Sequence, residues 1–539
     1  MKKLFIILLL LVAFPAWSAT YYVKTGGDDG AAGTSDETAW ATTSKVQSTV
    51  TADDTVYFRS QDTWSSSGTP LVLNATAGVT YDGSTYGSGT RAKFVGTADA
   101  NSGVYEVVRI FASNVIFKGF EIDGGAKYDT IGINVGHRDS VDIANVTIQK
   151  CVVHNVGDNN SNGWPYGIII SSGDGHTTSN VTVIDNEVYD TARGGLNLYA
   201  SWTTANNKVT GVTVRNNYVH GAGRYFNASA MDICNDIENS TIEYNVLSDS
   251  GSGIAIRVSP SGEGPGNVTT APTNVTIRYN LIRHNKIYGI FYNVDDRGLP
   301  FLVHIYGNLF VDNGYNANSP ADAAELKLDL GDADSVFNVY NNTFYTATNP
   351  NRNQSGMILL GLGDLSDTGA TINFNNNIVY ANISSSDATF RTIWDRWGAL
   401  AGTHSNNLIY RSSGASDLLV FDKNTSSYNR STLTNWEATA KNTNPAFSGG
   451  TLPTGFSGTY GSNMVPNTDY FQLTVDSPAK DTGATLEGYT GSINGAGLTT
   501  PIVRPLGAAF DIGAYEYGTV AQTGGSAGSG FKMQGVTIR

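Results

Sequence analysis

Short segments in which apolar and polar residues alternate recur along the middle of the chain. They lie at 180–188, 211–219, 239–247, 274–282, 302–310, 336–344 and 371–379. Alternation with period two is typical of a β-strand with one buried face. An asparagine recurs in register at intervals of 28 to 35 residues: Asn186, Asn217, Asn245, Asn280, Asn308, Asn342, Asn377 and Asn407. Such uneven spacing is untypical of helical repeats. In two earlier repeats, Cys151 and Phe120 stand at the position that the asparagine occupies in the others.

Each repeat carries a second short strand-like segment after the asparagine. These segments lie at 166–171, 195–199, 230–234, 253–257, 289–293, 325–329 and 357–360. A single turn of chain cannot bury its own apolar edge, so the turns must stack on one another. Coils of two or three short parallel strands predict a β-helix. Asparagines at an inward bend would then pair through their amides from coil to coil.

The two ends of the repeat region resemble a known group of proteins. The segments 20–25, 38–42 and 54–59 are similar to the entry segment, and 477–483 and 510–517 to the closing segment, of the pectate-lyase-like superfamily. This resemblance covers about 20–517 and implies an all-β, right-handed parallel β-helix with an N-terminal cap helix and a C-terminal cap. Trp40, Val46 and Val50 could line the cap helix. The chain lacks the arginine–proline signature of classical pectate lyases, the G-H-G segment of polygalacturonases and the D-P-H signature of mannuronan epimerases.

The chain begins with a segment typical of an exported bacterial protein. Lys2 and Lys3 precede an apolar run from 4 to 14, and the small residues Ala16 and Ser18 suit a signal peptidase. The apolar run is too short to span a bilayer. We therefore expect a secreted protein without a membrane span. The expected domains are 1–18 signal peptide, 19–100 N-terminal cap and first coils, 101–430 repeats, 431–517 last coils and C-terminal cap, and 518–539 flexible tail.

Charge and cysteine content exclude several kinds of partner and scaffold. The 33 Lys and Arg against 47 Asp and Glu give a net charge of −14, which disfavours nucleic acid and anionic membranes. Only 2 cysteines occur, too few for a disulfide scaffold, and we expect both to be free thiols.

Alternation also predicts which side chains face away from the core on the second strands. The outward positions are Asn197, Tyr199, Asp232, Arg257, Asn293, Lys327 and Asp329. With coils about 4.8 Å apart they would form a polar strip about 20 Å long. A sugar advances by a similar rise, so the strip could pair with an extended polysaccharide or cell-surface glycan. Preceding loops add Trp164, Tyr166 and Tyr225 for stacking on sugars, and Arg193 and Arg224 for attracting an acidic polymer.

The strip contains residue types that a polyuronate lyase needs. Such an enzyme neutralises a carboxylate, removes the proton alpha to it and stabilises the enolate. Arg257, Lys327 and Asp232 are the expected catalytic residues. By analogy with the resembled family, Asp158, Asp232, Asp295 and Asp296 could hold Ca²⁺. The sequence therefore favours an enzyme that cleaves an acidic glycan by β-elimination.

Two other functions remain open. A glycoside hydrolase needs two carboxylates about 5–10 Å apart. Asp232 and Asp329 would lie three coils, about 14 Å, apart, whereas Asp158 with Asp232 stays possible. The other alternative is a non-catalytic glycan-binding adhesin or phage-associated surface protein. On that view Asp232 and Arg257 form only a cross-coil ion pair, and Lys327 and Asp329 a solvated face.

Overall fold

The computed structural model describes most of the chain between residues 18 and 517. The exceptions within this range are 101–103, 137–140, 161–162, 202–205, 225–227, 259–270, 294–298, 316–322, 330–333, 348–355, 362–369, 384–389, 396–401, 415–416, 423–424, 450–451, 453–455, 458–464, 467–468, 487–504 and 506. The expected signal peptide, apart from Ser18, and the expected flexible tail lie outside the described residues. None of the helices in the described part is long and apolar enough to cross a membrane.

Three long sheets form the molecule, and the chain visits them in turn. Sheet A contains β1 (Thr20–Val23), β2 (Thr55–Arg59), β5 (Thr80–Tyr86), β8 (Ile116–Lys118), β11 (Ile143–Gln149), β14 (Thr177–Ile184), β17 (Lys208–Thr210), β18 (Thr213–Arg215), β21 (Ile237–Glu238), β22 (Thr241–Glu243), β25 (Thr273–Arg278), β28 (Leu302–Tyr306), β31 (Val336–Tyr340), β34 (Thr371–Asn375) and β37 (His404–Ser405). Sheet B contains β3 (Thr63–Ser65), β6 (Ala92–Val95), β9 (Phe120–Asp123), β12 (Val152–His154), β15 (Glu187–Tyr189), β19 (Tyr218–His220), β23 (Val246–Ser248), β26 (Leu281–Arg283), β29 (Leu309–Val311), β32 (Thr343–Thr346), β35 (Ile378–Ala381) and β38 (Leu408–Arg411). Sheet C contains β4 (Leu73–Asn74), β7 (Glu106–Ile110), β10 (Ile131–Val135), β13 (Ile168–Ser172), β16 (Leu196–Ala200), β20 (Ser229–Cys234), β24 (Ser252–Arg257), β27 (Tyr288–Asn293), β30 (Ala324–Leu328), β33 (Gly356–Leu360), β36 (Arg391–Asp395), β39 (Val420–Asp422) and β40 (Ser426–Tyr428).

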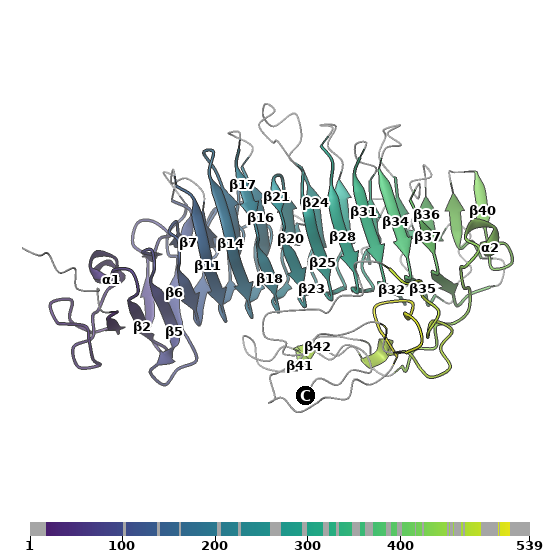
Figure 1. Cartoon of the computed structure of the whole chain (residues 1–539). Coiled ribbons are helices and arrows are strands. Elements are labelled where there is room, and N and C mark those ends of the chain that lie inside the picture. The colour runs from purple at the N-terminus through teal and green to yellow at the C-terminus, as the bar shows by residue number, and fades with distance from the viewer. Residues whose placement is uncertain are drawn as a thin grey trace, which may run out of the picture.

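The remaining described elements are few and short. They are the helices α1 (Thr43–Thr49) and α2 (Leu433–Trp436), a 3-10 turn at Asp469–Phe471, and the strand pair β41 (Phe456–Ser457) and β42 (Val465–Pro466). Successive coils stack from β2 at one end to β40 at the other (Figure 1). Strand pairs within the three sheets are parallel, except that β40 runs antiparallel to β39. The predicted parallel β-solenoid is confirmed, with about 11 turns and very little helix.

The core lies inside the solenoid, where side chains of one coil pack on those of the next. Ile168 and Ile170 of β13 stand in register with Leu196 and Leu198 of β16, and all four are at most 2% exposed. Ile169 and Asn197, which lie between these residues on the two strands, point away from the core. The predicted alternation on the second strands is therefore confirmed.

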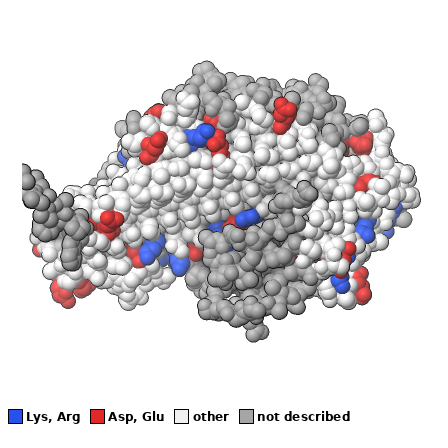
Figure 2. All heavy atoms as spheres, viewed as in Figure 1, with Lys and Arg blue, Asp and Glu red and all other residues white. Residues whose placement is uncertain are grey.

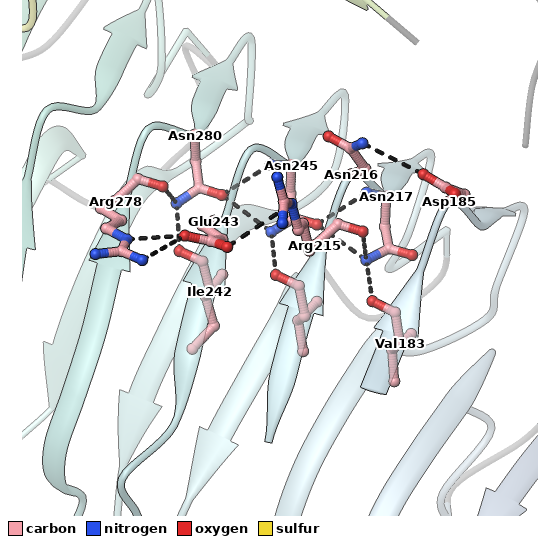
Figure 3. A network of polar contacts seen from close by, with 11 residues as sticks. Val183, Asp185, Arg215, Asn216, Asn217, Ile242, Glu243, Asn245, Arg278 and Asn280 are labelled. Atoms are coloured by element: carbon pink, nitrogen blue, oxygen red, sulfur yellow. Dashed lines mark hydrogen bonds and ion pairs between the residues drawn. The ribbon is translucent and has the colours of Figure 1, made fainter. Parts of the chain in front are cut away.

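The bend between sheets A and B depends on one asparagine per coil. The residue before each such asparagine often has a positive φ, as at Tyr244 and Tyr279, both +56°. This turns the asparagine side chain inward. Asn245 Nδ2 donates to Asn280 Oδ1 at 3.0 Å (Figure 3). Asn280 Nδ2 in turn donates to Asn308 Oδ1 at 3.0 Å.

The asparagine ladder runs without a break from Asn186 to Asn407. Its links lie between Asn186, Asn217, Asn245, Asn280, Asn308, Asn342, Asn377 and Asn407. At one end the backbone N–H of Cys151 donates to Asn186 Oδ1 at 2.9 Å. At the other end Asn407 donates through its backbone and its amide to Glu437, at 2.8 and 2.7 Å. The ladder is confirmed, and Glu437 is a terminus that the sequence did not reveal.

A second, shorter ladder lines the end of sheet B. Ser250 N donates to Asn285 Oδ1 at 3.1 Å, and Asn285 Nδ2 donates to Asn313 Oδ1 at 2.8 Å. Asn313 Nδ2 then donates to Glu325 Oε2 at 2.6 Å. Sequence analysis missed it. The sequence does contain a signal for this ladder, because Ser250, Asn285 and Asn313 each follow a ladder asparagine by five positions in three successive coils.

The N-terminal helix α1 begins after Thr42, whose side chain accepts a hydrogen bond from Lys45 N at 3.1 Å. Val46 in the helix is fully buried, together with Trp40 and Val50 on either side of it. These three residues join the solenoid core. The role of α1 as a cap over the first coil stays a prediction.

The chain beyond 445 folds back along the solenoid. Phe471 and Tyr515 are buried in a cluster with Tyr345 on the outer side of sheet B. Asn376 Nδ2 donates to Ala484 O at 2.8 Å, and Ala484 N donates to Asn376 Oδ1 at 2.7 Å. This C-terminal segment lies beneath β32 and β35 in Figure 1. It therefore covers part of one face of the solenoid.

The ladder predicts a specific loss of stability. Asn280→Leu should lower the free energy of unfolding by about 1–3 kcal/mol, because it leaves buried partners on two neighbouring coils without hydrogen bonds. Thr276→Val, on the outer face of the same coil, is the control and should change it by less than about 0.5 kcal/mol. Urea unfolding of both variants measures the difference. Equal midpoints would show that the ladder contributes nothing.

A charge cluster on sheet B predicts acid sensitivity. A hydrogen bond with His154 Nε2 (3.1 Å) and the ion pair with Lys93 Nζ (2.9 Å) lower the pKa of Glu121 to about 2. Because this folded-state pKa lies below the ordinary value of 4.5, the stabilisation is present above pH 4.5 and is lost as the pH falls towards 2. Glu121→Gln should therefore show a shallower fall of melting temperature between these pH values. Parallel melting curves for the two proteins would contradict the assignment.

Candidate functional site

The outer face of sheet C carries the predicted polar strip. Asn197 of β16 stands in register with Asp232 of β20, and Cys234 of β20 with Arg257 of β24. Lys327 follows two coils further on, in β30. The structure thus places the expected catalytic residues on one face, on strands of neighbouring coils.

Several of these outward side chains are nevertheless buried. Asn197 and Asp232 are 1% exposed, Asp329 is 5% and Tyr199 is 8% exposed. Side chains from the loop before β13 fold over the sheet, and the Trp164 ring lies 4.8 Å from that of Tyr199. The strip is therefore a covered layer and not the open face that alternation suggested. Alternation gives direction relative to the core, but it carries no information about loops that close over a strand.

Asp232 lies at the centre of a charged cluster. Its Oδ2 accepts a hydrogen bond from Arg257 Nη2 at 2.8 Å and another from the Tyr166 hydroxyl. Arg257 Nε also donates to Cys234 Sγ at 3.3 Å. Asp232 and Arg257 thus form an ion pair across neighbouring coils.

The electrostatics of this cluster limit the roles of its members. The neighbouring Asp232 carboxylate raises the pKa of Arg257 above its already high value. Burial raises the pKa of the Cys234 thiol to about 11 and that of Tyr166 well above its usual value. Arg257 is therefore a fixed cation and a poor base. With Cys151 also buried, both cysteines are free thiols as predicted.

Tyr166 spans two coils to reach Asp232. Its ring passes over Gly194, where a Cβ would lie 2.2 Å from Tyr166 Cε1, so only glycine leaves the space. The Tyr166 side chain is completely buried. The expectation that this ring stacks on a sugar is therefore wrong, and its hydroxyl instead holds the carboxylate in place.

Asn197 is an unusual member of the layer. Both its Nδ2 and its Oδ1 are buried, and neither has a hydrogen-bond partner among the described residues. It lies one coil before Asp232 in the same row. Leaving a buried amide without hydrogen bonds costs about 1–3 kcal/mol.

Trp164 forms the exposed edge of the cluster. It is 39% exposed, and the Arg193 guanidinium lies 5.2 Å from its ring centroid. Arg193 Nη1 donates to Gly163 O at 2.5 Å, and this hydrogen bond links the loop before β16 to the loop before β13. Arg224 Nη2 donates to Gly157 O at 3.3 Å on the neighbouring loop. Of the predicted aromatic contacts, Trp164 thus remains accessible, whereas Tyr225 lies outside the described residues.

Lys327 is held by its own neighbours. Its Nζ lies 3.3 Å from Asp329 Oδ2 and 5.5 Å from the centroid of the Tyr288 ring. Only 13% of the Lys327 side chain is exposed. The alternative of a solvated Lys327–Asp329 face is therefore wrong, because the pair lies against aromatic surface. Asn293 belongs to β27, but its side chain lies outside the described residues.

The expected calcium ligands do not come together in the described part of the chain. No group of three or more His, Cys, Asp or Glu side chains there could hold a metal ion. Asp158 lies in a turn where its Oδ1 accepts from Asn160 N at 3.0 Å, and Asp232 already accepts from Arg257 and Tyr166. Asp295 and Asp296 are not among the described residues. The calcium site stays a prediction.

Another charged cluster lies on sheet A and has a different character. Arg278 donates through Nε to Glu243 Oε2 at 2.8 Å (Figure 3). Its Nη1 donates to the Tyr306 hydroxyl at 2.9 Å. Arg215 lies 3.7 Å from the same carboxylate on the other side. The contacts join successive coils, so we interpret this cluster as structural. Elsewhere over the strands of sheet A, charged side chains are sparse in Figure 2.

Comparisons with known proteins give distant likenesses only. No family model and no curated protein matches the chain. Among solved structures, pectate lyase Pel9A aligns at 15% identity with a TM-score of 0.47, covering 93% of this chain and 96% of that chain. The A-module of mannuronan C-5 epimerase AlgE6 from Azotobacter vinelandii aligns at 16% identity with a TM-score of 0.47, covering 72% and 91%. The Dettilon tailspike protein aligns at 16% identity with a TM-score of 0.43, covering 75% and 68%. These values are too low to assign an activity.

The Asp232–Arg257 pair predicts coupled stability effects. Arg257→Met should lower the free energy of unfolding by about 2 kcal/mol, because it leaves Asp232 buried without its cation. The loss is less than for a fully buried pair, since 33% of the Arg257 side chain is exposed. Adding Asp232→Asn to this variant should restore part of the lost free energy of unfolding. Urea unfolding of the single and double variants gives the coupling energy, and additive effects would contradict the pairing.

Proposed function

We propose that this protein binds an extended anionic polysaccharide along the outer face of sheet C, with one sugar held at Asn197, Asp232 and Arg257. The observation that carries the proposal is the buried Asn197 amide, which lacks a partner among the described residues. A sugar hydroxyl can both donate to and accept from an amide, and a uronate carboxylate can accept from its Nδ2. Because Asn197 is 1% exposed, a sugar reaches this amide only when the side chains that cover it move. Binding would then remove the cost that the unsatisfied amide imposes on the free protein.

The charges around Asn197 suit an acidic polymer. The Arg193 guanidinium lies 5.9 Å from the Tyr166 ring centroid and 5.2 Å from that of Trp164. Arg257 also acts electrostatically on Tyr166. Trp164 is the exposed aromatic surface next to these cations and suits a pyranose face. On a chain of net charge −14, a local concentration of arginines is a selective attraction for an anionic ligand. A leader at 1–18 would deliver the protein to such a polymer outside the cytoplasm.

Cleavage by β-elimination is the second candidate function. Arg257 keeps its charge because Asp232 raises its pKa, and its partly exposed guanidinium suits a uronate carboxylate and the enolate formed from it. Lys327, two coils away, is the residue type for the base. Glycoside hydrolysis is less well supported. Asp232 and Asp329 lie three coils, about 14 Å, apart, beyond the separation that hydrolysis uses.

Asn197→Leu separates binding from stability. It should leave the free energy of unfolding unchanged or raise it by about 1 kcal/mol, because an unsatisfied buried amide is replaced by an apolar group of similar size. It should weaken binding of polyuronate about tenfold, the equivalent of one lost hydrogen bond of about 1.4 kcal/mol. Thermal melting and calorimetric titration with soluble polyuronates measure the two effects.

Asn134→Leu is the matched control. Asn134 lies in the same row two coils earlier and accepts a hydrogen bond from Ser171 Oγ at 3.3 Å. This variant should lose stability and keep its affinity. Unchanged affinity in Asn197→Leu would overturn the assignment of the site. Ultraviolet absorbance from unsaturated chain ends would establish elimination, and tight binding without new ends would leave a binding protein.

A further inference from the structure

The row of outward residues that contains Asp232 continues along sheet C well beyond the cluster. Successive strands contribute Ala255, Phe291, Lys327, Leu359, Trp394 and Phe421 in register. With about 4.8 Å between coils, Trp394 lies about 24 Å from Asp232 along the solenoid. Up to Lys327 the row mixes polar, charged and apolar residues, whereas Leu359, Trp394 and Phe421 at the far end are all apolar.

The far end of the row carries a cation between two aromatic rings. The Arg391 guanidinium lies 4.4 Å from the Trp394 ring centroid and 4.6 Å from that of Phe421. All three residues are partly exposed. Trp394 also packs against a buried outer cluster formed by Tyr288 and Leu359, separate from the solenoid core. The Trp394 ring is therefore held by buried side chains on one side and is partly exposed on the other, so it forms a preformed surface.

We propose that Arg391, Trp394 and Phe421 form a far subsite for the same anionic polysaccharide, about five sugars from the one at Asp232. The inference rests on the proposed function. A guanidinium beside aromatic surface can pair with a sugar carboxylate while the ring contacts C–H groups of a pyranose. The coil spacing is similar to the rise of a sugar, so one extended chain can reach both places. The protein is therefore selective for long chains over short ones.

Chain length is the variable that tests the subsite. Calorimetric titration would compare uronate oligomers of about three and about twelve sugars, since only the longer ones span the roughly 24 Å. The unmodified protein should bind the long oligomer at least about tenfold more tightly, and Trp394→Ala should remove that advantage without changing affinity for the short oligomer. Arg391→Gln, which keeps both rings, should reduce the advantage too. Trp436→Ala is the control, because Trp436 stacks on His404 of sheet A and should leave the length dependence unchanged.

The outcomes separate this inference from the proposed function. If Asn197→Leu weakens the binding of both oligomers but the unmodified protein shows no preference for the long one, the far subsite is wrong and the proposed function stands. If neither oligomer binds, the proposed function fails and the subsite fails with it. If Trp394→Ala changes the mass measured by light scattering and not the affinity, the aromatic end is an interface between copies of this chain. That result would also overturn the subsite.

Discussion

The structure depends on one buried hydrogen-bond donor and acceptor per coil at the bend between sheets A and B. In a parallel solenoid each coil receives its backbone hydrogen bonds from its neighbours, so an error in register at one bend would displace every strand beyond it. The asparagine amide fixes the bend because its Oδ1 accepts a hydrogen bond from the asparagine of the preceding coil while its Nδ2 donates to the asparagine of the next coil. Glu437 ends this column, and Glu325 ends the shorter one, with carboxylates that accept hydrogen bonds from the last asparagine.

This rigid stack allows the outer face of sheet C to hold groups that are costly to bury. Asp232 is almost completely buried outside the core, and its position is fixed by Arg257 from the next coil and Tyr166 from two coils before. Cross-coil contacts of this kind need strands whose spacing cannot relax.

The faces of the solenoid have different roles for physical reasons. The C-terminal segment covers part of sheet B with an apolar cluster that includes Phe471 and Tyr515. Sheet A carries the Glu243 network, whose partners lie on adjacent coils. The outer face of sheet C combines arginines, the exposed Trp164 and the unsatisfied Asn197 amide among the residues that the structure describes. The case for a ligand on this face therefore comes from contacts and burial.

The sequence by itself determined the parallel β-solenoid, the asparagine ladder and the direction of the side chains on sheet C. Those features follow from period-two alternation and from one residue type recurring at a bend, and both are local patterns that stacking must satisfy. Only the tertiary structure decided that Tyr166 is buried against Asp232, that Asn197 is covered and that Trp164 remains accessible. Burial of an outward side chain depends on loops and on coils that are distant in sequence. The Glu325 and Glu437 termini were likewise hidden, because a carboxylate ends a ladder only where the next coil lacks an asparagine in register.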